Sequence, residues 1–159
     1  MQKKKVCMVG DFSVGKTSLT QQFVNNVFSD KYLTTIGVKI DTVELDDTKL
    51  IIWDVAGRDS LSPINASYLV GAAGIVLVCD GTRSSTVSGL MDIWQVVKNR
   101  VGDVPVVVAF NKSDVEGWKI DQASYAAFAE NGWETFVTSA KDGQNVDALF
   151  KALVAKIIP

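Results

Sequence analysis

Short apolar runs alternate along this chain with segments whose apolar residues recur every three or four positions. Runs of the first kind predict buried strands, and segments of the second kind predict helices with one apolar face. The predicted strands are Lys5–Gly10, Val38–Leu45, Lys49–Val55, Gly74–Asp80, Val104–Phe110 and Glu134–Val137. The predicted helices are Lys16–Asn25, Val87–Arg100, Gln122–Asn131 and Val146–Ile158. This alternation is typical of a mostly parallel sheet covered by helices on both faces.

One pair of predicted strands departs from the parallel pattern. Only Asp46–Thr48 separates the second strand from the third, and so short a turn permits an antiparallel hairpin. The expected fold is therefore α/β, with a six-stranded, mostly parallel sheet and one antiparallel edge strand. The 159 residues contain no repeat, low-complexity segment or linker, so residues 1–159 are expected to form a single domain.

Composition narrows the possible functions. Sixteen basic and 18 acidic residues leave a net charge of −2, so no global field attracts nucleic acid or a membrane. The absence of histidine excludes histidine-based acid–base chemistry, and Cys7 and Cys79 have neither disulfide nor zinc-ligand spacing. No apolar stretch approaches the ~18 residues of a membrane-spanning helix. We expect a cytoplasmic protein that associates with membranes only through a tail or partner not present here.

Four polar clusters follow predicted strands. They read GDFSVGKT, DVAG, NKSD and TSAK, and they follow the first, third, fifth and sixth strands. In open α/β sheets, ligands bind beyond the carboxyl ends of the strands. The sequence therefore predicts that the four clusters meet in one binding site.

The first cluster, Gly10–Thr17, matches the phosphate-binding pattern G-x-x-x-x-G-K-[ST]. Its glycines let backbone amides converge on phosphate oxygens, Lys16 reaches the β- and γ-phosphates, and the Thr17 hydroxyl ligates Mg²⁺. A glycine-containing turn with an incidental lysine is the alternative, and the preceding strand and following helix disfavour it. The predicted phosphate-site residues are Asp11, Phe12, Ser13, Val14, Gly15, Lys16, Thr17 and Ser18.

The second cluster contributes Asp54 and Gly57 at the end of the third strand. A carboxylate at Asp54 can hold magnesium through water, and Gly57 lets a backbone N–H approach the terminal phosphate. Taken alone, an aspartate and a glycine after a strand usually mark a turn. The phosphate-binding pattern upstream is what favours a metal site.

The third and fourth clusters predict the base. Guanine presents two donors, N1–H and the N2 amine, which one carboxylate accepts as a pair, and adenine lacks that pattern. Asp114 is expected to read the base, Lys112 to lay its stem along it, and Asn111 to join neighbouring loops. The predicted base-site residues are Asn111, Lys112, Asp114, Ser139, Ala140 and Lys141, with the Ala140 N–H directed at guanine O6 and Lys141 packed opposite. An ATP-using enzyme with the same phosphate loop is the disfavoured alternative.

Asp80 and Arg83, which follow the fourth strand, touch the nucleotide periphery or organise a loop. We favour the second role, because a structural role is the default for residues outside the four clusters.

The motifs GDFSVGKT, TTIGVKI, LIIWDVAG, NKSD and TSAK resemble those of the Ras superfamily of small GTPases in order and spacing. The resemblance covers essentially the whole chain. The sequence IGV after Thr35, Trp53 before Asp54, and SYLVGAAGIVLVCD are most like the Rab branch.

This resemblance implies a P-loop NTPase fold with a six-stranded sheet and about five helices, and a monomeric signalling switch that binds GTP or GDP with Mg²⁺. It implies that Thr35 binds Mg²⁺ and senses the γ-phosphate, that Phe28 stacks edge-on against guanine, and that Tyr32 closes over the phosphates. The alternative for both aromatic residues is hydrophobic anchoring of a loop. The resemblance also implies effector and regulator contacts through two switches, Val27–Gly37 and Gly57–Leu69.

Two departures from the family pattern affect hydrolysis. Arg58 stands where the family places a glutamine that orients the attacking water, and Asp59 replaces a glutamate. Phe12 occupies a position that the family fills with a small residue, where a ring can crowd the γ-phosphate. The Ras switch is itself slow, on the order of 10⁻⁴ s⁻¹, so slower hydrolysis is expected here.

Two interpretations of the role of Arg58 are possible. It is either a solvated arginine on a loop, with hydrolysis impaired, or an arginine acting in cis on the developing charge. We favour the first, because an arginine cannot accept the proton of the attacking water or orient that water as an amide can. The predicted catalytic residues are Lys16, Thr35, Gly57 and Arg58, and the predicted metal ligands are Thr17, Thr35 and Asp54. A GTP-binding interaction scaffold that barely hydrolyses its nucleotide is the alternative function.

Overall fold

The computed structural model describes residues 2–11, 14–25, 38–45, 47–55, 67–114, 116–117 and 122–157. For Asn25 and residues 122–125 it describes the backbone only. Within these residues, no helix combines the length and the apolar character needed to cross a membrane.

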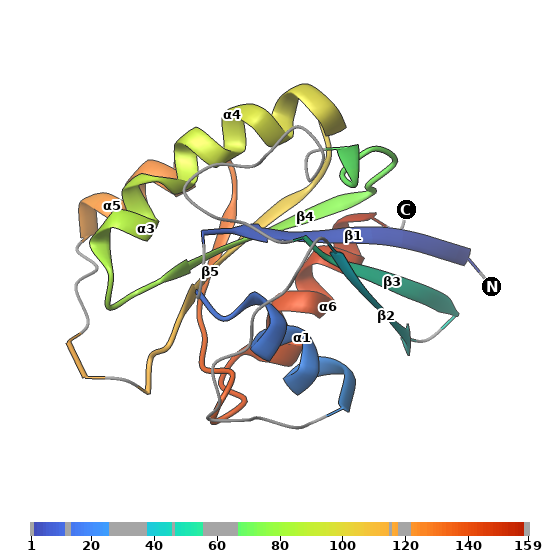
Figure 1. The fold of residues 1–159 in the computed structure, drawn as a ribbon, viewed down its shortest axis with the longest axis horizontal. Helices are drawn as coiled ribbons and strands as arrows, with labels where there is room; N and C mark the ends of the chain where they lie inside the picture. Colours follow the sequence, from blue (N-terminus) through green and yellow to red (C-terminus); the bar gives the residue numbers. More distant parts are fainter. Residues whose placement is uncertain are drawn as a thin grey trace.

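Six strands form one sheet with the order β2-β3-β1-β4-β5-β6 (Figure 1). The strands β2 and β3 pair antiparallel, and every other neighbouring pair is parallel. The strands are β1 (Gln2–Gly10), β2 (Val38–Leu45), β3 (Thr48–Val55), β4 (Gly74–Asp80), β5 (Val106–Asn111) and β6 (Glu134–Val137). The predicted fold class, including its antiparallel edge strand, is confirmed.

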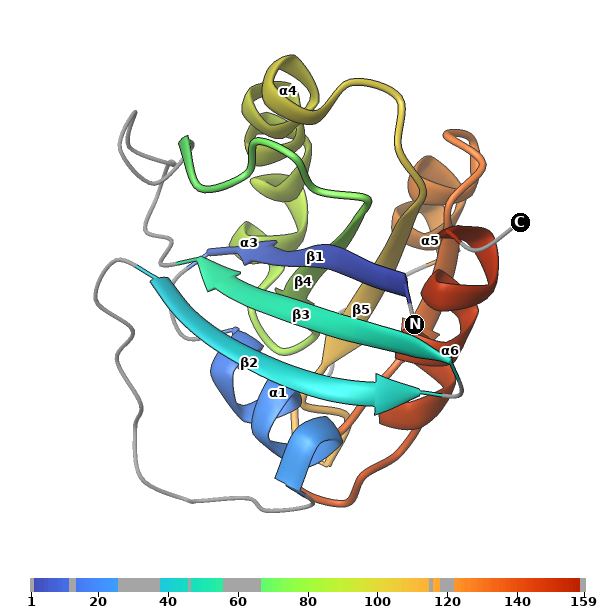
Figure 2. The ribbon, with the colours of Figure 1, turned by 90° about the vertical axis from the view of Figure 1, so that its right-hand side faces the viewer.

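Helices cover both faces of the sheet (Figure 2). Helices α1 (Lys16–Asn25) and α6 (Val146–Ile157) lie on one face, and α3 (Ser84–Ser88), α4 (Leu90–Val101) and α5 (Gln122–Ala129) lie on the other. Each face has its own apolar core, because successive side chains of a strand point to opposite sides. Val6 and Met8 of β1 pack in the core with α1 and α6, whereas Cys7 and Val9 pack in the core with α3, α4 and α5.

The predicted helix Val87–Arg100 is wrong at its start and in its continuity. Helical backbone begins at Ser84 in α3, and Gly89 separates α3 from α4. The first turn of α3 is held by the Thr86 hydroxyl, which accepts a hydrogen bond from the Asp80 N–H and donates one to the Arg83 carbonyl. Apolar periodicity begins only at Val87, so the sequence pattern did not indicate this polar turn.

Several predicted strand and helix limits shift by one to three residues. The strand β1 begins at Gln2 instead of Lys5, and β5 runs from Val106 to Asn111 instead of ending at Phe110. The last shift matters for function. Asn111 is still paired in the sheet, opposite Asp80 of β4, so its backbone direction is fixed by the strand.

Candidate functional site

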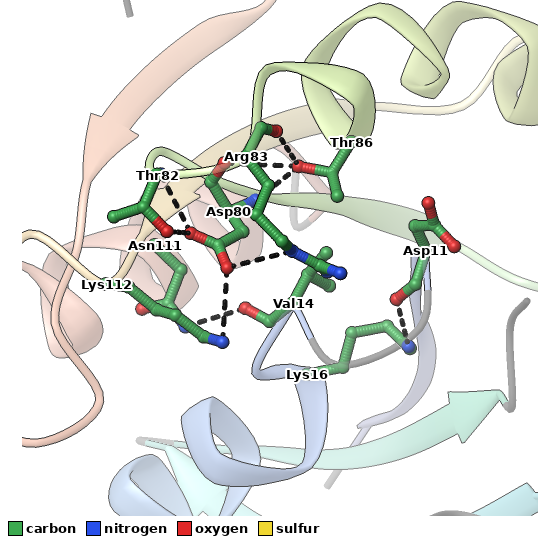
Figure 3. A network of polar contacts seen from close by, with 9 residues as sticks. All are labelled: Asp11, Val14, Lys16, Asp80, Thr82, Arg83, Thr86, Asn111 and Lys112. Carbon is green, nitrogen blue, oxygen red and sulfur yellow. Dashed lines mark hydrogen bonds and ion pairs between the residues drawn. The ribbon is translucent and has the colours of Figure 1, made fainter. Parts of the chain in front are cut away.

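The described residues of the four predicted polar clusters meet at the carboxyl edge of the sheet. Figure 3 shows the loop after β1 beside the ends of β4 and β5. The topology explains this convergence, because β3, β1, β4, β5 and β6 are successive neighbours and run parallel, so their carboxyl ends lie on the same edge.

Gly10 and Gly15 of the predicted phosphate-binding loop lie directly against the neighbouring strands. A Cβ on Gly10 would lie 2.2 Å from the Val78 carbonyl oxygen, and a Cβ on Gly15 would lie 2.2 Å from Asn111 Nδ2. Gly15 also has φ of +100°, a conformation that side chains disfavour. Both glycines therefore fulfil steric requirements of the loop, which passes into α1 at Lys16.

Asn111 connects three segments that are distant in sequence. Its side-chain nitrogen donates to the Val14 carbonyl in the phosphate loop at 2.9 Å. Its side-chain oxygen accepts from the Thr138 hydroxyl at 3.1 Å, just before Ser139-Ala140-Lys141. Asn111 is 1% exposed, so these bonds are shielded from water. The expectation that Asn111 bonds to neighbouring loops agrees with these contacts.

Lys16 is a buried cation near two carboxylates. Lys16 is 7% exposed, and its ammonium donates to the Asp11 backbone carbonyl at 3.2 Å. Burial lowers the pKa of Lys16, and the negative charges of Asp54 and Asp11 partly oppose that shift. A phosphate group beside Lys16 would favour the charged form of the ammonium.

Thr17 and Asp54 bring hard oxygen ligands together. The Thr17 hydroxyl, at the start of α1, donates a hydrogen bond to Asp54 Oδ2, at the end of β3. Asp54 is fully buried. Hydroxyl and carboxylate oxygens are the donor set that Mg²⁺ prefers, so these two residues fit a magnesium ion coordinated together with phosphate oxygens. The described part of the chain contains no group of three or more His, Cys, Asp or Glu side chains that could hold a metal ion, so phosphate oxygens would have to complete this site.

The loops expected to hold the base are bonded to each other. Ser139 donates from its hydroxyl to Asp114 Oδ1 at 2.9 Å, and accepts the Asp142 N–H at 3.0 Å. The Ser113 N–H reaches the Thr138 carbonyl at 3.1 Å. Asp114 is exposed and Ala140 is buried. The loop after β5 is therefore joined to the loop after β6, with the Asp114 carboxylate accessible at the surface.

Lys112 has a second contact beyond the one expected at the base. Its ammonium lies 3.2 Å from Asp80 Oδ2, and its backbone has φ of +70°. Asp80 also accepts hydrogen bonds from the Thr82 N–H and hydroxyl on Oδ1 and from Arg83 Nε on Oδ2. The loop-organising role favoured for Asp80 and Arg83 agrees with these bonds. The link from Asp80 to Lys112 was not predicted, because no local pattern relates the last residue of β4 to the residue that follows β5.

Other predicted site residues are placed without a decisive contact. Ser18 is half-buried in the first turn of α1, and Lys141 is exposed in the loop after β6. Several predictions lie outside the described residues. These are the roles of Phe12, Ser13, Phe28, Tyr32, Thr35, Gly57 and Arg58, the first switch Val27–Gly37, and the second switch Gly57–Leu69 except its last three residues.

Comparison with known proteins agrees with this geometry. The model of the Ras family matches residues 5–159. Ras-related protein RABE1e of Arabidopsis thaliana is 36% identical over 161 residues, an alignment that covers 96% of this chain and 74% of the relative. Ras-related protein Rab-13 of Mesocricetus auratus is 36% identical over 162 residues, covering 97% of this chain and 79% of the relative. This chain therefore belongs to the Ras family of GTP-binding small GTPases and is most like its Rab branch.

Proposed function

We propose that residues 1–159 act as a single domain that binds GTP or GDP with Mg²⁺ and hydrolyses GTP slowly to GDP and phosphate. The observation that carries the proposal is the position of Asn111. Its two side-chain bonds tie the phosphate loop, through Val14, to the loop after β6, through Thr138. A nucleotide whose phosphates lie on the phosphate loop would have its base beside the loops that follow β5 and β6.

Asp114 selects the base in this proposal. An ionised carboxylate only accepts hydrogen bonds, and guanine offers two adjacent donors where adenine does not. The Ser139 hydroxyl supports this role, because its bond to Asp114 Oδ1 at 2.9 Å restricts the carboxylate before any ligand arrives. The buried Ala140 supplies its N–H to guanine O6, and the Lys112 and Lys141 stems pack against the two sides of the ring.

Lys16 and the loop amides hold the phosphates. The Lys16 ammonium is already close to the loop, where it bonds to the Asp11 carbonyl, so little rearrangement is needed to meet a phosphate. Thr17, Thr35 and Asp54 would hold Mg²⁺, Thr17 through its hydroxyl and Asp54 through water. When bound, Mg²⁺ neutralises charge on the β- and γ-phosphate oxygens.

Hydrolysis requires a water in line with the γ-phosphorus and a group that orients it. Lys16 and the backbone N–H of Gly57 stabilise the negative charge that develops on the phosphate. Arg58 replaces the glutamine that orients water in the family, and it cannot accept a hydrogen bond from that water. We therefore expect turnover below about 10⁻⁴ s⁻¹ in the absence of a partner.

Partners would recognise the two switch segments, Val27–Gly37 and Gly57–Leu69, in the GTP state. The proposed location is the cytoplasm, and the proposed state is a monomer. Because turnover is slow, the GTP-bound form would persist until an activating protein or an intrinsic hydrolysis event converts it to GDP.

Nucleotide competition tests the binding part of this proposal. Guanine and adenine nucleotides compete against a fluorescent GDP analogue, with and without Mg²⁺. We expect guanine nucleotides to compete at least 100-fold better, on the order of the discrimination available to a polar site that pairs one base only. Equal competition by ATP would exclude a guanine-specific switch.

Single-turnover hydrolysis tests the role of Arg58. We expect Arg58→Gln to hydrolyse GTP about tenfold faster than the wild-type chain, because an amide can both donate to and accept from water. Arg100→Gln, on the exposed end of α4, is the matched control and should leave the rate unchanged. A slower Arg58→Gln variant would show that Arg58 acts in cis, and undetectable hydrolysis by every variant would favour a GTP-binding scaffold.

A further inference from the structure

Asp80 is a buried carboxylate whose two oxygens have different partners. Oδ1 accepts the Thr82 N–H at 2.8 Å and the Thr82 hydroxyl at 2.6 Å, so this oxygen closes the loop after β4. Oδ2 lies 3.2 Å from Arg83 Nε and 3.2 Å from the Lys112 ammonium. Figure 3 shows Lys112 and Arg83 reaching this oxygen from different segments. The two hydrogen bonds from Thr82 to Oδ1 stabilise a turn. Of the two cations near Oδ2, Lys112 is a residue of the predicted base site.

The position of Asp80 is fixed more firmly than that of Lys112. The Asp80 side chain is 2% exposed and that of Lys112 is 34% exposed. The Asp80 backbone is held in the sheet opposite Asn111, and its N–H donates to the Thr86 hydroxyl. A firmly held, buried anion therefore contacts a flexible, half-exposed cation. Contact of this kind restricts the cation far more than the anion.

Lys112 needs such a restraint. A lysine side chain has four flexible carbons and many rotamers, and ordering them on binding weakens affinity. Its backbone lies in the left-handed region, with φ of +70°, so the chain turns sharply away from β5 at this residue. The ammonium contact with Asp80 fixes the far end of the side chain while the backbone turn fixes the near end.

We propose that Asp80 is a positioning residue for nucleotide binding, because it holds Lys112 with its stem set against the guanine ring. This inference rests on the proposed function, since it presumes that Lys112 packs on a bound base. Asp80 then slows nucleotide release without touching the nucleotide. Burial raises the pKa of Asp80, but the hydrogen bonds from Thr82 and the charge of Lys112 outweigh that effect and lower the pKa overall, which favours the ionised carboxylate.

Asp80→Asn isolates the proposed effect. The amide oxygen can keep the two bonds from Thr82, while its NH₂ group replaces the oxygen that faces Lys112 and Arg83. The measurement is the rate at which a fluorescent GDP analogue dissociates in the presence of Mg²⁺ and excess GDP. We expect Asp80→Asn to raise this rate about fivefold, as for loss of a half-exposed ion pair.

A second background separates positioning from general structural damage. Lys112→Met keeps the apolar stem and removes the ammonium, so the ion pair between residue 112 and Asp80 is absent in this background. In the Lys112→Met background, Asp80→Asn should change dissociation by less than about twofold, because the two substitutions remove the same interaction. Thermal unfolding of each variant reports any structural change separately.

Arg83→Gln is the matched control, because it removes the other cation on the same oxygen and leaves Lys112 in place. Its dissociation rate should stay within about twofold of the wild-type rate. If Asp80→Asn does not fold, Asp80→Glu is measured in both backgrounds, since it moves the charge by one methylene.

Two results would overturn the inference alone. One is an equal acceleration by Asp80→Asn in both backgrounds, and the other is no acceleration in the wild-type background. A different result would overturn the proposed function as well: a wild-type chain that does not retain the GDP analogue. Because retention by the wild-type chain is measured first, the two failures are distinguishable.

Discussion

The two ends of the candidate site are organised differently. At the base end, the side chains of Asn111 and Asp114 are already hydrogen-bonded to other groups of the protein. Asn111 donates one bond and accepts another, and Asp114 accepts one. At the phosphate end, Lys16 is buried and its pKa is lowered by that burial, so its charge is incompletely compensated. The base end is therefore shaped before ligand binds, whereas the phosphate end gains most from an added anion.

This difference separates selectivity from affinity. Preorganised hydrogen-bonding groups discriminate between bases because a wrong base leaves them unpaired. A buried cation attracts any phosphate of suitable size and adds affinity without reading the base. Substitutions at the two ends should consequently change different measured quantities.

The largest effect is expected from Lys16→Met. Loss of charge-assisted bonds to phosphate should weaken GDP binding on the order of 100-fold, while the preference for GDP over inosine diphosphate stays unchanged. Competition against a fluorescent GDP analogue measures both quantities. Lys151→Met, at an exposed position of α6, is the control and should bind as the wild-type chain does. A change in base preference on Lys16→Met would contradict the separation of the two ends.

The next effect is expected from Asp114→Asn. The introduced amide presents a donor toward the donors of guanine, so GDP affinity should fall about 30-fold. Xanthine has an acceptor in place of the guanine N2 amine, so affinity for xanthosine diphosphate should rise. Direct titration of both nucleotides gives the ratio. Glu130→Gln, an exposed substitution after α5, serves as control. Equal weakening of both nucleotides would mean that Asp114 supports the loop and does not read the base.

The smallest effect is the pH dependence of stability in the nucleotide-free protein. The pKa of Lys16 is lower in the folded chain than in the unfolded chain, so between these two values the unfolded state binds more protons. The Lys16 contribution to stability should therefore rise with pH in that range, by at most about 1.4 kcal/mol per pH unit. Burial raises the pKa of Cys7 and of Cys79, so these two thiols oppose that rise at alkaline pH, and the Lys16 contribution is the difference from Lys16→Met. Denaturant unfolding of nucleotide-free protein between pH 7 and 10 measures the slope.

Two comparisons test whether the slope of stability against pH comes from Lys16. Lys16→Met should lose this contribution, and bound GDP should reduce it because the phosphates favour the charged ammonium. A slope that is the same in Lys16→Met would assign the pH dependence to other groups.

The local parts of the fold and site could be predicted from the sequence. The strand and helix pattern follows from apolar periodicity, and the phosphate loop follows from glycines and a lysine at fixed spacing. The start of α3 was missed because it does not depend on apolar periodicity. That turn is polar and depends on Thr86 bonding to Asp80 and Arg83, so periodicity gives no signal for it.

The sequence by itself determined the alternation of elements and the chemical groups available at each loop, because these depend on residues close together in the chain. Tertiary structure alone decided which groups meet. Asn111 bonds to Val14 across 97 positions, and Lys112 contacts Asp80 across two neighbouring strands. Such contacts depend on strand order and register, which bring the carboxyl ends of β1, β4 and β5 to one edge.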